Sequence, residues 1–533
     1  MAGKNILAEL SRYKTGTFSD VIYRNALLRG NNTAFICGKE RVTFAEFNAR
    51  VNSLVRALQS LGVQKGETIG ILAWNCMEYT YVIGAAMKGG FIVSPYNPRL
   101  SASDLEYLIH YSDTAVVFVA PEFAETVKKL RPQLSKVKNV ITLEKSLQEM
   151  LYVQDLLKAN SSEEPDVQVK EDDPVTIIYT SGTTGRPKGA LYTHGRITEN
   201  AKVNMSVLPI RTTDRNILVL QLFHVASMEF FQIALFAGAA NILLGSFDPA
   251  VFMQTVQDEK ATITALVPTA LAAVFNLPDF GKYDHSSLTR VTYLGSPMPV
   301  VLLKKGIEKF GLVFCGQYGQ TESGPIVSVL PQAEHKAAFG TPEEQKLLSS
   351  CGRPVLGVHT RIVDRDGKDV APGEIGEIIV QNKEMMKEYW HKPKETSETL
   401  VDGWLHTRDL AYYDEKGYLY IADRKEDMII TGGEHVFPRE VEEVLYQHNM
   451  VLEAAVIGVP DAYWVERVHA VVALKKGATC TSEELIEFCK QRMSRFKAPK
   501  SVEFIESLPK NATGKIMKTE LRKKFKETTE KKS

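Results

Sequence analysis

Paired cysteines, net charge and long apolar runs are all missing from this chain of 533 residues. Its six cysteines stand singly, with no Cys-x-x-Cys pair and no cluster with histidine. This pattern argues against a disulfide framework and a cysteine zinc site, and it predicts reduced thiols in a cytoplasmic protein. Lys+Arg and Asp+Glu both number 64, so the formal net charge is zero. We therefore expect neither nucleic acid nor an anionic membrane surface as a partner.

No segment predicts a membrane span. The first ten residues lack the apolar core of a signal peptide. The longest uncharged run, Phe230 to Phe247, is interrupted by Gln232, Gly238, Asn241 and Gly245. Length alone would allow a transmembrane helix. We instead predict a buried helix that turns at Gly238 into a buried strand, and a protein without an integral membrane segment.

The pattern of apolar residues predicts an α/β fold. Thr43 to Glu46 reads as a capping box, and apolar residues follow it at helical spacing up to Gly62. Short β-branched runs follow, with helical stretches between them, and this alternation favours largely parallel sheets. The predicted strands are Thr68–Leu72, Val116–Val119, Val140–Leu143 and Val175–Tyr179.

The composition and the pattern of predicted elements change after about Asp423. Charged helices alternate with short strands from there on, enough for one small α+β domain. The predicted helices are Pro438–His448 and Ser482–Met493, and the predicted strands are Ala454–Val459 and His469–Leu474. The five consecutive charges from Asp423 to Asp427 predict a solvated connector, and the basic tail after Lys515 predicts a solvated, fraying end.

The segment from Tyr179 to Gly189 follows a predicted strand and is the most informative in the chain. It packs four Ser/Thr hydroxyls, three glycines and one lysine into eleven residues. Small residues let backbone N–H groups approach a polyphosphate closely, and Lys188 adds positive charge. Pro187 stands where a Walker A loop needs glycine. The alternative is a flexible polar turn, which this density of hydroxyls disfavours. The candidate phosphate ligands are Thr180, Ser181, Gly182, Thr183, Thr184 and Lys188.

This loop resembles the signature of the adenylate-forming superfamily, which includes acyl-CoA synthetases, luciferases and peptide-synthetase adenylation domains. Four further blocks resemble that family's motifs and occur in the family's order over most of the chain. They are Tyr318-Gly319-Gln320-Thr321-Glu322, Gly403 to Asp409, Asp423 to Asp427 followed by Gly432-Gly433-Glu434, and Pro509 to Lys515. Any one block could arise by chance, but five in order are a specific signal.

The resemblance assigns roles around the nucleotide. It makes Lys515 the lysine that acts in adenylation and Glu322 the carboxylate that positions Mg²⁺, with Thr184 assisting. It places Asp409 and Arg424 at the ribose hydroxyls. The block at 317–321 adds Gln317, Tyr318, Gly319 and Thr321 to the ATP/AMP-binding residues, with Tyr318 flat against adenine. Taken singly, each of these residues would more often be a surface, turn or salt-bridge residue.

The resemblance also implies an acid pocket, a thiol channel and a hinge. His224 matches the family's position near the reacting carboxylate, although a lone histidine in an apolar stretch is more often a core residue. The predicted acid-pocket residues are His224, Val267, Gly295, Ser296 and Gly319. Gly432, Gly433 and Glu434 are the predicted channel for the CoA thiol, and Glu426 is the predicted hinge. The family more often has Met at the position of Gln320 and Gly at that of Gln317, which leaves details of specificity open.

The function implied is an ATP-dependent acyl-CoA synthetase that joins a carboxylic acid to coenzyme A through an acyl-adenylate. The predicted pocket segments contain no Lys or Arg to meet a second carboxylate, so we expect an apolar monocarboxylic acid, either a medium- or long-chain fatty acid or an aryl acid. Two alternatives remain open. One is a ligase that loads a separate carrier protein, and the other is a nucleotide-binding homologue without catalysis.

The architecture implied by the resemblance is a large N-terminal domain of stacked α/β subdomains, residues 1–424, and a mobile C-terminal α+β lid, residues 425–533. The implied small-molecule partners are the acid, ATP and CoA, with Mg²⁺ as cofactor. Both a monomer and a homodimer are open.

Overall fold

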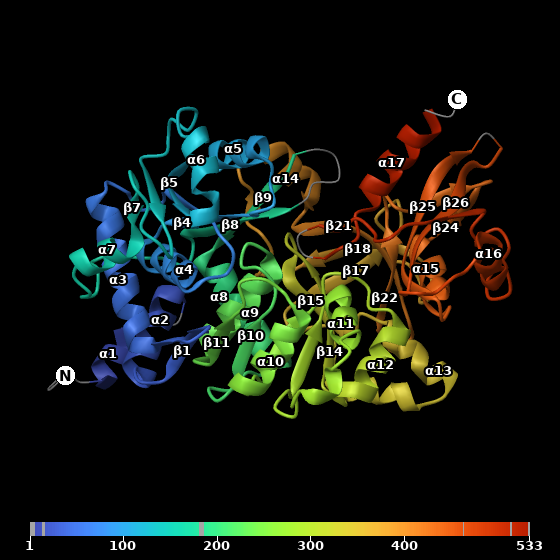
Figure 1. Cartoon of the computed structure of the whole chain (residues 1–533), viewed down its shortest axis with the longest axis horizontal. Coiled ribbons are helices and arrows are strands. Elements are labelled where there is room, and N and C mark those ends of the chain that lie inside the picture. The colour runs from blue at the N-terminus through green and yellow to red at the C-terminus, as the bar shows by residue number, and fades with distance from the viewer. Residues whose placement is uncertain (1–5, 13–15, 181–185, 462, 512–513, 531–533) are drawn as a thin grey trace.

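The computed structural model describes residues 6–12, 16–180, 186–461, 463–511 and 514–530. Figure 1 shows a large N-terminal domain, coloured from blue through yellow to light orange, and a smaller C-terminal domain in deeper orange and red at the right. Two large sheets, each with parallel strands at its centre, form the core of the first domain. The α/β class expected from the sequence is confirmed.

The first large sheet has eight strands in the order β19-β9-β8-β4-β3-β5-β6-β7. Its strands pair in parallel except at β8–β9 and β9–β19, which are antiparallel. The four strands predicted from β-branched runs all lie in it. The strands are β3 Thr68–Leu72, β4 Ile92–Tyr96, β5 Thr114–Val119, β6 Asn139–Thr142, β7 Leu151–Tyr152, β8 Pro174–Thr180, β9 Lys188–Thr193 and β19 Glu388–Tyr389.

The second large sheet has nine strands in the order β16-β15-β14-β13-β12-β10-β11-β1-β2. Helix α9 ends at Gly238, whose φ of 77° is in the left-handed region that glycine tolerates, and the chain then enters the buried strand β11. The predicted turn from helix to strand is thus confirmed. The strands are β1 Thr33–Cys37, β2 Glu40–Thr43, β10 Arg215–Leu218, β11 Ala240–Leu243, β12 Ile263–Leu266, β13 Arg290–Tyr293, β14 Phe314–Gln320, β15 Gly324–Leu330 and β16 Arg353–Pro354.

Two five-stranded sheets complete the fold, and the second belongs to the C-terminal domain with its own apolar clusters. The first consists of β17 His359–Val363, β18 Gly376–Gln381, β20 Leu400–Val401, β21 Trp404–Tyr413 and β22 Leu419–Arg424. The second consists of β23 Ile429–Thr431, β24 Glu434–Val436, β25 Val451–Asp461, β26 Val465–Leu474 and β27 Ser501–Phe504. The two strands and two helices predicted after Asp423 are present in this domain.

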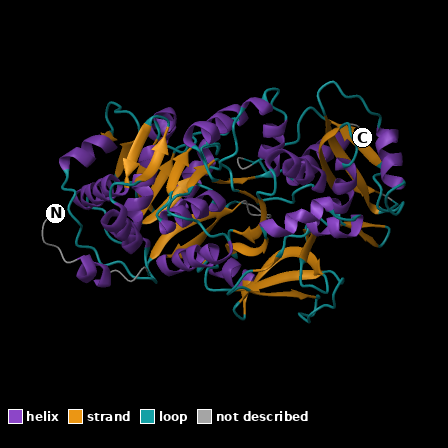
Figure 2. Ribbon diagram, turned by 90° about the horizontal axis from the view of Figure 1, so that it is seen from below, coloured by secondary structure: helices purple, strands orange, loops and turns teal. Residues whose placement is uncertain are grey.

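Helices pack around the sheets (Figure 2). In the N-terminal domain they are α1 Ile6–Arg12, α2 Phe18–Arg29, α3 Phe44–Ser60, α4 Met77–Gly89, α5 Ala102–Tyr111, α6 Ala124–Leu130, α7 Val153–Ala159, α8 His194–Val207, α9 Val225–Ala237, α10 Pro249–Glu259, α11 Pro268–Phe275, α12 Val300–Phe310, α13 Pro342–Gln345 and α14 Pro393–Thr399. The C-terminal domain has α15 Pro438–Tyr446, α16 Ser482–Lys490 and α17 Lys518–Glu530. The capping box of Thr43 and Glu46 opens α3 as predicted. Within the ranges described, the longest apolar helices still fall short of what a membrane crossing needs.

The basic tail is not a fraying end, so that prediction is wrong. Residues after Lys515 form helix α17, which packs against β25. Leu521 is buried there beside Ile457 and Val459. The error arose because a high density of charge hid the one apolar face that a helix of this length needs for docking.

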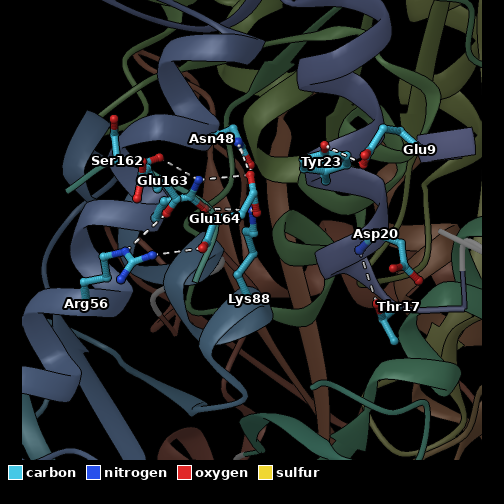
Figure 3. Close-up of polar contacts among 11 residues, drawn as sticks. Glu9, Thr17, Asp20, Tyr23, Asn48, Arg56, Lys88, Ser162, Glu163 and Glu164 are labelled. Atoms are coloured by element: carbon cyan, nitrogen blue, oxygen red, sulfur yellow. Dashed lines mark hydrogen bonds and ion pairs between the residues drawn. The ribbon is translucent and has the colours of Figure 1, made fainter. Parts of the chain in front are cut away.

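A buried cation ties the connection after α7 to helices α3 and α4 (Figure 3). The side chain of Lys88 on α4 is only 3% exposed, and it forms an ion pair with Glu164. Its Nζ also donates to the side-chain oxygens of Asn48 and Asn52, each at 2.7 Å. Burial lowers the pKa of Lys88. The charged form therefore depends on these three oxygen partners.

We expect Glu164→Ala to lower the free energy of unfolding by about 2 kcal/mol. A broken buried pair typically costs more, but the Glu164 side chain is itself 37% exposed, so solvent screens part of the loss. Urea denaturation measures the change. The control is Glu398→Ala, which removes a solvent-exposed partner of Lys394 at 4.0 Å and should leave the midpoint unchanged. Equal midpoints for the two variants would contradict a stabilising role for the Lys88 pair.

Candidate active site

The block at 318–322 closes strand β14 and turns into β15. Tight packing requires glycine at position 319, because a Cβ there would lie 2.2 Å from the carbonyl oxygen of Pro325. Ser323 Oγ accepts a hydrogen bond from the backbone N–H of Gln320 at 2.9 Å and so fixes the turn. The side chains of Tyr318 and Glu322 are thereby presented at the carboxyl end of a central strand, where α/β sheets bind ligands.

Asp409 is the hub of the polar site. Strands β21 and β22 pair so that Asp409 lies directly opposite Arg424, and the Arg424 Nε donates to its Oδ1 at 2.7 Å. The other carboxylate oxygen accepts from Tyr318 Oη at 2.8 Å and from Gln320 Nε2 at 2.6 Å. Asp409 is buried, so these three donors hold a desolvated carboxylate in one orientation. The structure thus joins three of the sequence blocks at one residue.

Glu322 and Lys188 meet at Tyr389, a residue that the sequence reasoning missed. Tyr389 Oη donates to Glu322 Oε1 at 2.9 Å, and Lys188 Nζ lies 5.0 Å from the centroid of the Tyr389 ring. Burial and the Glu322 carboxylate raise the pKa of Tyr389, so it remains a neutral donor. No sequence signal could have linked Tyr389 to residues so distant in the chain, because strand pairing of β19 with β9 brings it there.

The candidate phosphate loop is the tip of the hairpin formed by β8 and β9. Thr180 and Lys188 lie opposite each other at the ends of these antiparallel strands. The predicted ligands between them, Ser181, Gly182, Thr183 and Thr184, lie outside the described residues. Thr321 contacts the same hairpin farther from its tip, where its carbonyl oxygen accepts from Tyr192 Oη on β9.

The C-terminal domain places Lys515 beside this site. Thr269 Oγ1 at the start of α11 donates to the carbonyl oxygen of Gly514 at 3.3 Å. Solvent still reaches the Lys515 side chain, but the crowding of protein around it and the Arg424 guanidinium lower the pKa of its ammonium. Asp409 acts on Lys515 in the opposite direction, so the ammonium lies within the electrostatic reach of the hub.

His224 caps helix α9. Its Nδ1 accepts the backbone N–H of Ala226 at 3.2 Å. Burial and the positive charge of Lys515 lower the pKa of His224 to about 4, so the ring is neutral near pH 7. A neutral imidazole that accepts at Nδ1 carries its proton on Nε2. His224 is therefore a hydrogen-bond donor near Lys515, and not a second cation.

Two of the predicted acid-pocket residues lie against each other close to Gly514. A Cβ on Gly295, whose φ is 83°, would lie 3.4 Å from Val267 Cγ1. A Cβ on Gly514 would lie 3.4 Å from Val267 Cγ2. Val267 therefore stands between the Gly295 loop and the Lys515 loop. Ser296 follows Gly295 and is half-buried.

The predicted thiol channel lies elsewhere. Gly432, Gly433 and Glu434 form an exposed turn between β23 and β24. The Gly432 N–H donates to the carbonyl oxygen of Trp464 at 2.9 Å, and a Cβ on Gly433 would meet no atom within 4 Å. The turn and Lys515 thus occupy different parts of the C-terminal domain.

The connector from Asp423 to Asp427 is more buried than its composition predicts. Asp423 is buried and accepts the backbone N–H of Arg439 at 2.9 Å, and Arg522 on α17 pairs with Asp427 at 2.5 Å. Lys425 and Glu426 are exposed, and Glu426 has a loose partner in Arg424 at 3.9 Å. The prediction of a solvated connector therefore holds for these two residues and is wrong for Asp423 and Asp427, which α17 neutralises through Lys518 and Arg522.

Gln317 is turned away from the Asp409 hub. Its Nε2 donates to Glu229 Oε2 at 2.9 Å and to the carbonyl oxygen of Pro325 at 3.0 Å. The sequence reasoning also missed Glu229, although a signal existed. Glu229 is the one charged residue between Arg215 and Asp248, within a strongly apolar helix.

The residues present fit a magnesium ion that is bound mainly by a ligand. Mg²⁺ usually takes one or two carboxylates together with substrate phosphates and waters. Glu322 offers such a carboxylate beside Lys188, with Tyr389 fixing one oxygen. Within the described part of the chain, no cluster of three or more His, Cys, Asp or Glu residues could hold a metal on its own.

Two protein-family models and several known proteins match this chain. A family model described as "AMP-binding enzyme" matches residues 22–390, and one described as "AMP-binding enzyme C-terminal domain" matches residues 440–515. The chain is similar to a feruloyl-CoA synthase from an Amycolatopsis species, with 36% identity over 503 residues, 94% of this chain and 98% of the relative. It is also similar to the medium/long-chain-fatty-acid–CoA ligase FadD8 of Mycobacterium tuberculosis, with 34% identity over 509 residues, 93% of this chain and 88% of the relative.

Among solved structures, the anthranilate CoA ligase AuaEII in complex with anthranoyl-AMP matches with a TM-score of 0.90 and 29% identity. The match covers 96% of this chain and 98% of that one.

We expect Gly514→Ala to weaken the docking of the Lys515 loop on α11. The new Cβ would lie 2.6 Å from Thr269 Oγ1 at a φ of 82°, a strain that should shift docking by about ten- to a hundredfold. Amide hydrogen exchange at residues 267–275 should accelerate. The control is Gly477→Ala, which has a similar φ of 78° but no atom within 4 Å of the new Cβ. Equally fast hydrogen exchange in both variants would mean that backbone strain alone causes the effect, and it would contradict docking of the Lys515 loop through Gly514.

Proposed function

This chain belongs to the AMP-binding enzyme family, and on that premise we propose that it is an ATP-dependent carboxylic acid–CoA ligase. The reaction joins an acid, ATP and CoA into acyl-CoA, AMP and pyrophosphate. The observation that carries the proposal is the position of Lys515, which lies beside both the Asp409 hub and His224. A nucleotide-binding protein without catalysis would have no use for a lysine at that point.

Adenylation is the first half-reaction. The carboxylate of the acid attacks the α-phosphorus of ATP, and pyrophosphate leaves. Negative charge develops on the α-phosphoryl oxygens, and fixed cations stabilise it better than acid–base groups do. Lys515 supplies such a cation on one side and Lys188 on the other. His224, with its proton on Nε2, donates to the carboxylate of the acid and orients it.

We assign the binding of the nucleotide to the residues around Asp409 and to the phosphate loop. The Asp409 carboxylate accepts the ribose hydroxyls, and Arg424, whose Nε lies 2.7 Å from it, aligns that carboxylate. The Tyr318 ring stacks on adenine. Gly319 and Thr321 offer backbone groups next to it, and the 180–188 loop takes the phosphates. Glu322 would hold Mg²⁺ with help from Thr184, and the ion would supply positive charge to the phosphates.

The acid is an apolar monocarboxylate, either a fatty or an aryl acid. The predicted pocket residues His224, Val267, Gly295, Ser296 and Gly319 offer no cation to a second carboxylate. Each buried methylene contributes about 0.8 kcal/mol, so selectivity should rise with chain length until the pocket is full. Acetate and dicarboxylates should therefore be poor substrates.

The experiment measures AMP and thioester formation for octanoate, phenylpropanoate, acetate and malonate, with CoA present and absent. Octanoate and phenylpropanoate should have the higher kcat/KM, and thioester should form only when CoA is present. The highest kcat/KM for acetate or malonate would contradict the pocket assignment. AMP release that depends on an added acyl carrier protein, with no thioester to CoA, would favour the carrier-loading ligase instead.

The second half-reaction needs a different pose of the C-terminal domain. The thiol of CoA attacks the acyl carbon and AMP leaves, and we assign its path to Gly432, Gly433 and Glu434. That turn is exposed while Lys515 is docked, which supports a rotation between the half-reactions. We place the domain boundary between residues 424 and 425, so that 1–424 is the fixed domain and 425–533 the lid. We propose Glu426 as the hinge because it is exposed and its ion pair, with Arg424 at 3.9 Å, stays within the connector, whereas Asp423 and Asp427 pair with Lys518 and Arg522 of α17.

Glu426→Pro should trap the docked pose, because proline fixes φ near −65° and a hinge must change it. Pyrophosphate exchange should stay near the wild-type rate while acyl-CoA production falls roughly a hundredfold. Glu426→Ala is the control and should keep both half-reactions. Equal loss of both half-reactions in the proline variant would exclude a hinge at this position.

Lys515→Ala should have the opposite effect. It should lower the rate of pyrophosphate exchange by about 10²–10³-fold, while thioester still forms from acyl-AMP and CoA.

A cytoplasmic location is also part of the proposal, and it is supported by the absence of disulfides among the cysteines at 37, 76, 315, 351, 480 and 489, all of which lie in the described ranges. A homodimer stays a prediction, which light scattering in solution tests directly.

A further inference from the structure

A small cavity lies beside the candidate active site. Helix α9 contributes Val225, Met228, Glu229 and Gln232, which recur at helical spacing and so share one face. Strand β8, which runs into the phosphate loop, contributes Thr176 and Ile178. The rest of the lining is Tyr192 on β9, Ile197 and Asn200 on α8, and Pro325 on β15. Strands β8 and β9 and helix α9 carry or adjoin residues with a proposed catalytic or nucleotide-binding role, whereas α8 does not.

The cavity is polar at one end. Glu229 is 2% exposed, yet it is a carboxylate in a helix that is otherwise apolar. Asn204 Nδ2 donates to its Oε1 at 2.8 Å, and Gln317 Nε2 donates to its Oε2 at 2.9 Å. Desolvation raises the pKa of Glu229 to about 7, even though these amides favour its charged form. A buried carboxylate costs stability, so a use for it is expected.

Three further buried polar atoms have no partner within the described residues. Thr176 Oγ1 and Asn200 Nδ2 belong to residues that line the cavity, each 3% exposed, and Gln317 Oε1 belongs to the 8%-exposed residue that donates to Glu229. Buried polar groups are normally paired, so these atoms call for a ligand or a water molecule. The free space of the cavity is about 20 Å³, enough for one water-sized group but not for an aromatic ring.

The cavity reaches the start of α9, because Val225, the residue after His224, is part of its lining. His224 caps α9, and Glu229 follows it by five residues on the same helix. At 1.5 Å per residue this is about 7 Å along the helix axis. An acid whose carboxylate meets His224 and whose body lies along α9 therefore brings its far end to Glu229. Met228, which lines the path, is flexible enough to make room for a ring before the narrow end.

We propose that the cavity is the far end of the acid pocket, and that Glu229, held by Gln317, selects an acid that carries a hydroxyl group about one ring's length from its carboxylate. The inference rests on the function proposed above and refines the apolar acid at one position. A hydroxyl both donates to Glu229 and accepts from Thr176, and it has the size of the free space. A carboxylate would be repelled by Glu229, and a methoxy group would neither donate nor fit.

Glu229 is thus a specificity-determining residue rather than part of the adenylation chemistry. The alternative is that Glu229, Gln317 and Asn204 form a structural network which no substrate touches. The two differ in the ratio of kcat/KM between acids that are identical except for the hydroxyl, because a purely structural network would not change that ratio.

The test compares para-hydroxyphenylpropanoate with phenylpropanoate, using acid-dependent release of AMP and pyrophosphate by the full chain. Wild type should prefer the hydroxylated acid by about ten- to a hundredfold in kcat/KM. Glu229→Leu should abolish that preference by raising activity on phenylpropanoate relative to the hydroxylated acid. Glu229→Gln keeps the shape of the side chain but only one acceptor oxygen. It should retain less than about a tenth of the wild-type preference for the hydroxylated acid. This variant tests the inference if the leucine variant does not fold.

The matched control is Glu384→Gln. Glu384 is also a buried carboxylate whose pKa is raised to about 7 by burial, but it lies beside Gly324 and does not line the cavity. It should leave the ratio at the wild-type value. Equal kcat/KM for the two acids in wild type, or a ratio unchanged in both Glu229 variants, would overturn the inference while leaving the ligase intact. No AMP release with any acid would instead overturn the proposed function.

Discussion

The ionic contact between Asp409 and Arg424 is the constraint on which the rest of the site depends. It joins β21 to β22, the last strand before the connector, and its carboxylate also fixes Tyr318 and Gln320 at the end of β14. We propose that this one buried carboxylate sets the position of the adenine and ribose groups and the point at which the lid begins. Its negative charge also acts on the ammonium of Lys515.

The docked lid depends on a second set of charges. Arg522 and Lys518 on α17 neutralise Asp427 and Asp423 at the two ends of the connector, and the backbone N–H of Arg439 also donates to Asp423. The C-terminal helix thus holds the connector in the docked pose, although its sequence looks like a solvated tail. The two motifs of the lid also lie in different surroundings, which agrees with the different steps that we propose for them. The Lys515 loop faces α11, while the Gly432 turn is exposed.

The sequence predicted the fold class, the main parallel strands and the helix that turns at Gly238. These features could be predicted because the spacing of apolar residues along a short segment indicates both its secondary structure and its burial. It also predicted, by family resemblance, residues that the structure gathers around Lys515. It could not predict Tyr389 as the bridge between Glu322 and Lys188, since only long-range strand pairing creates that contact. It misread α17 and the connector because charge density alone does not reveal which charges are paired. Glu229 could have been found, as a lone carboxylate in an apolar helix.

The central claim is that the docked site activates a carboxylic acid as its adenylate before CoA takes part. The most direct measurement is the exchange of labelled pyrophosphate into ATP in the absence of CoA, with and without an apolar acid. The account predicts exchange that depends on the acid and on Mg²⁺, and that is carried out by the wild-type chain without any thiol. Exchange that occurs without acid, or that requires CoA, would contradict it.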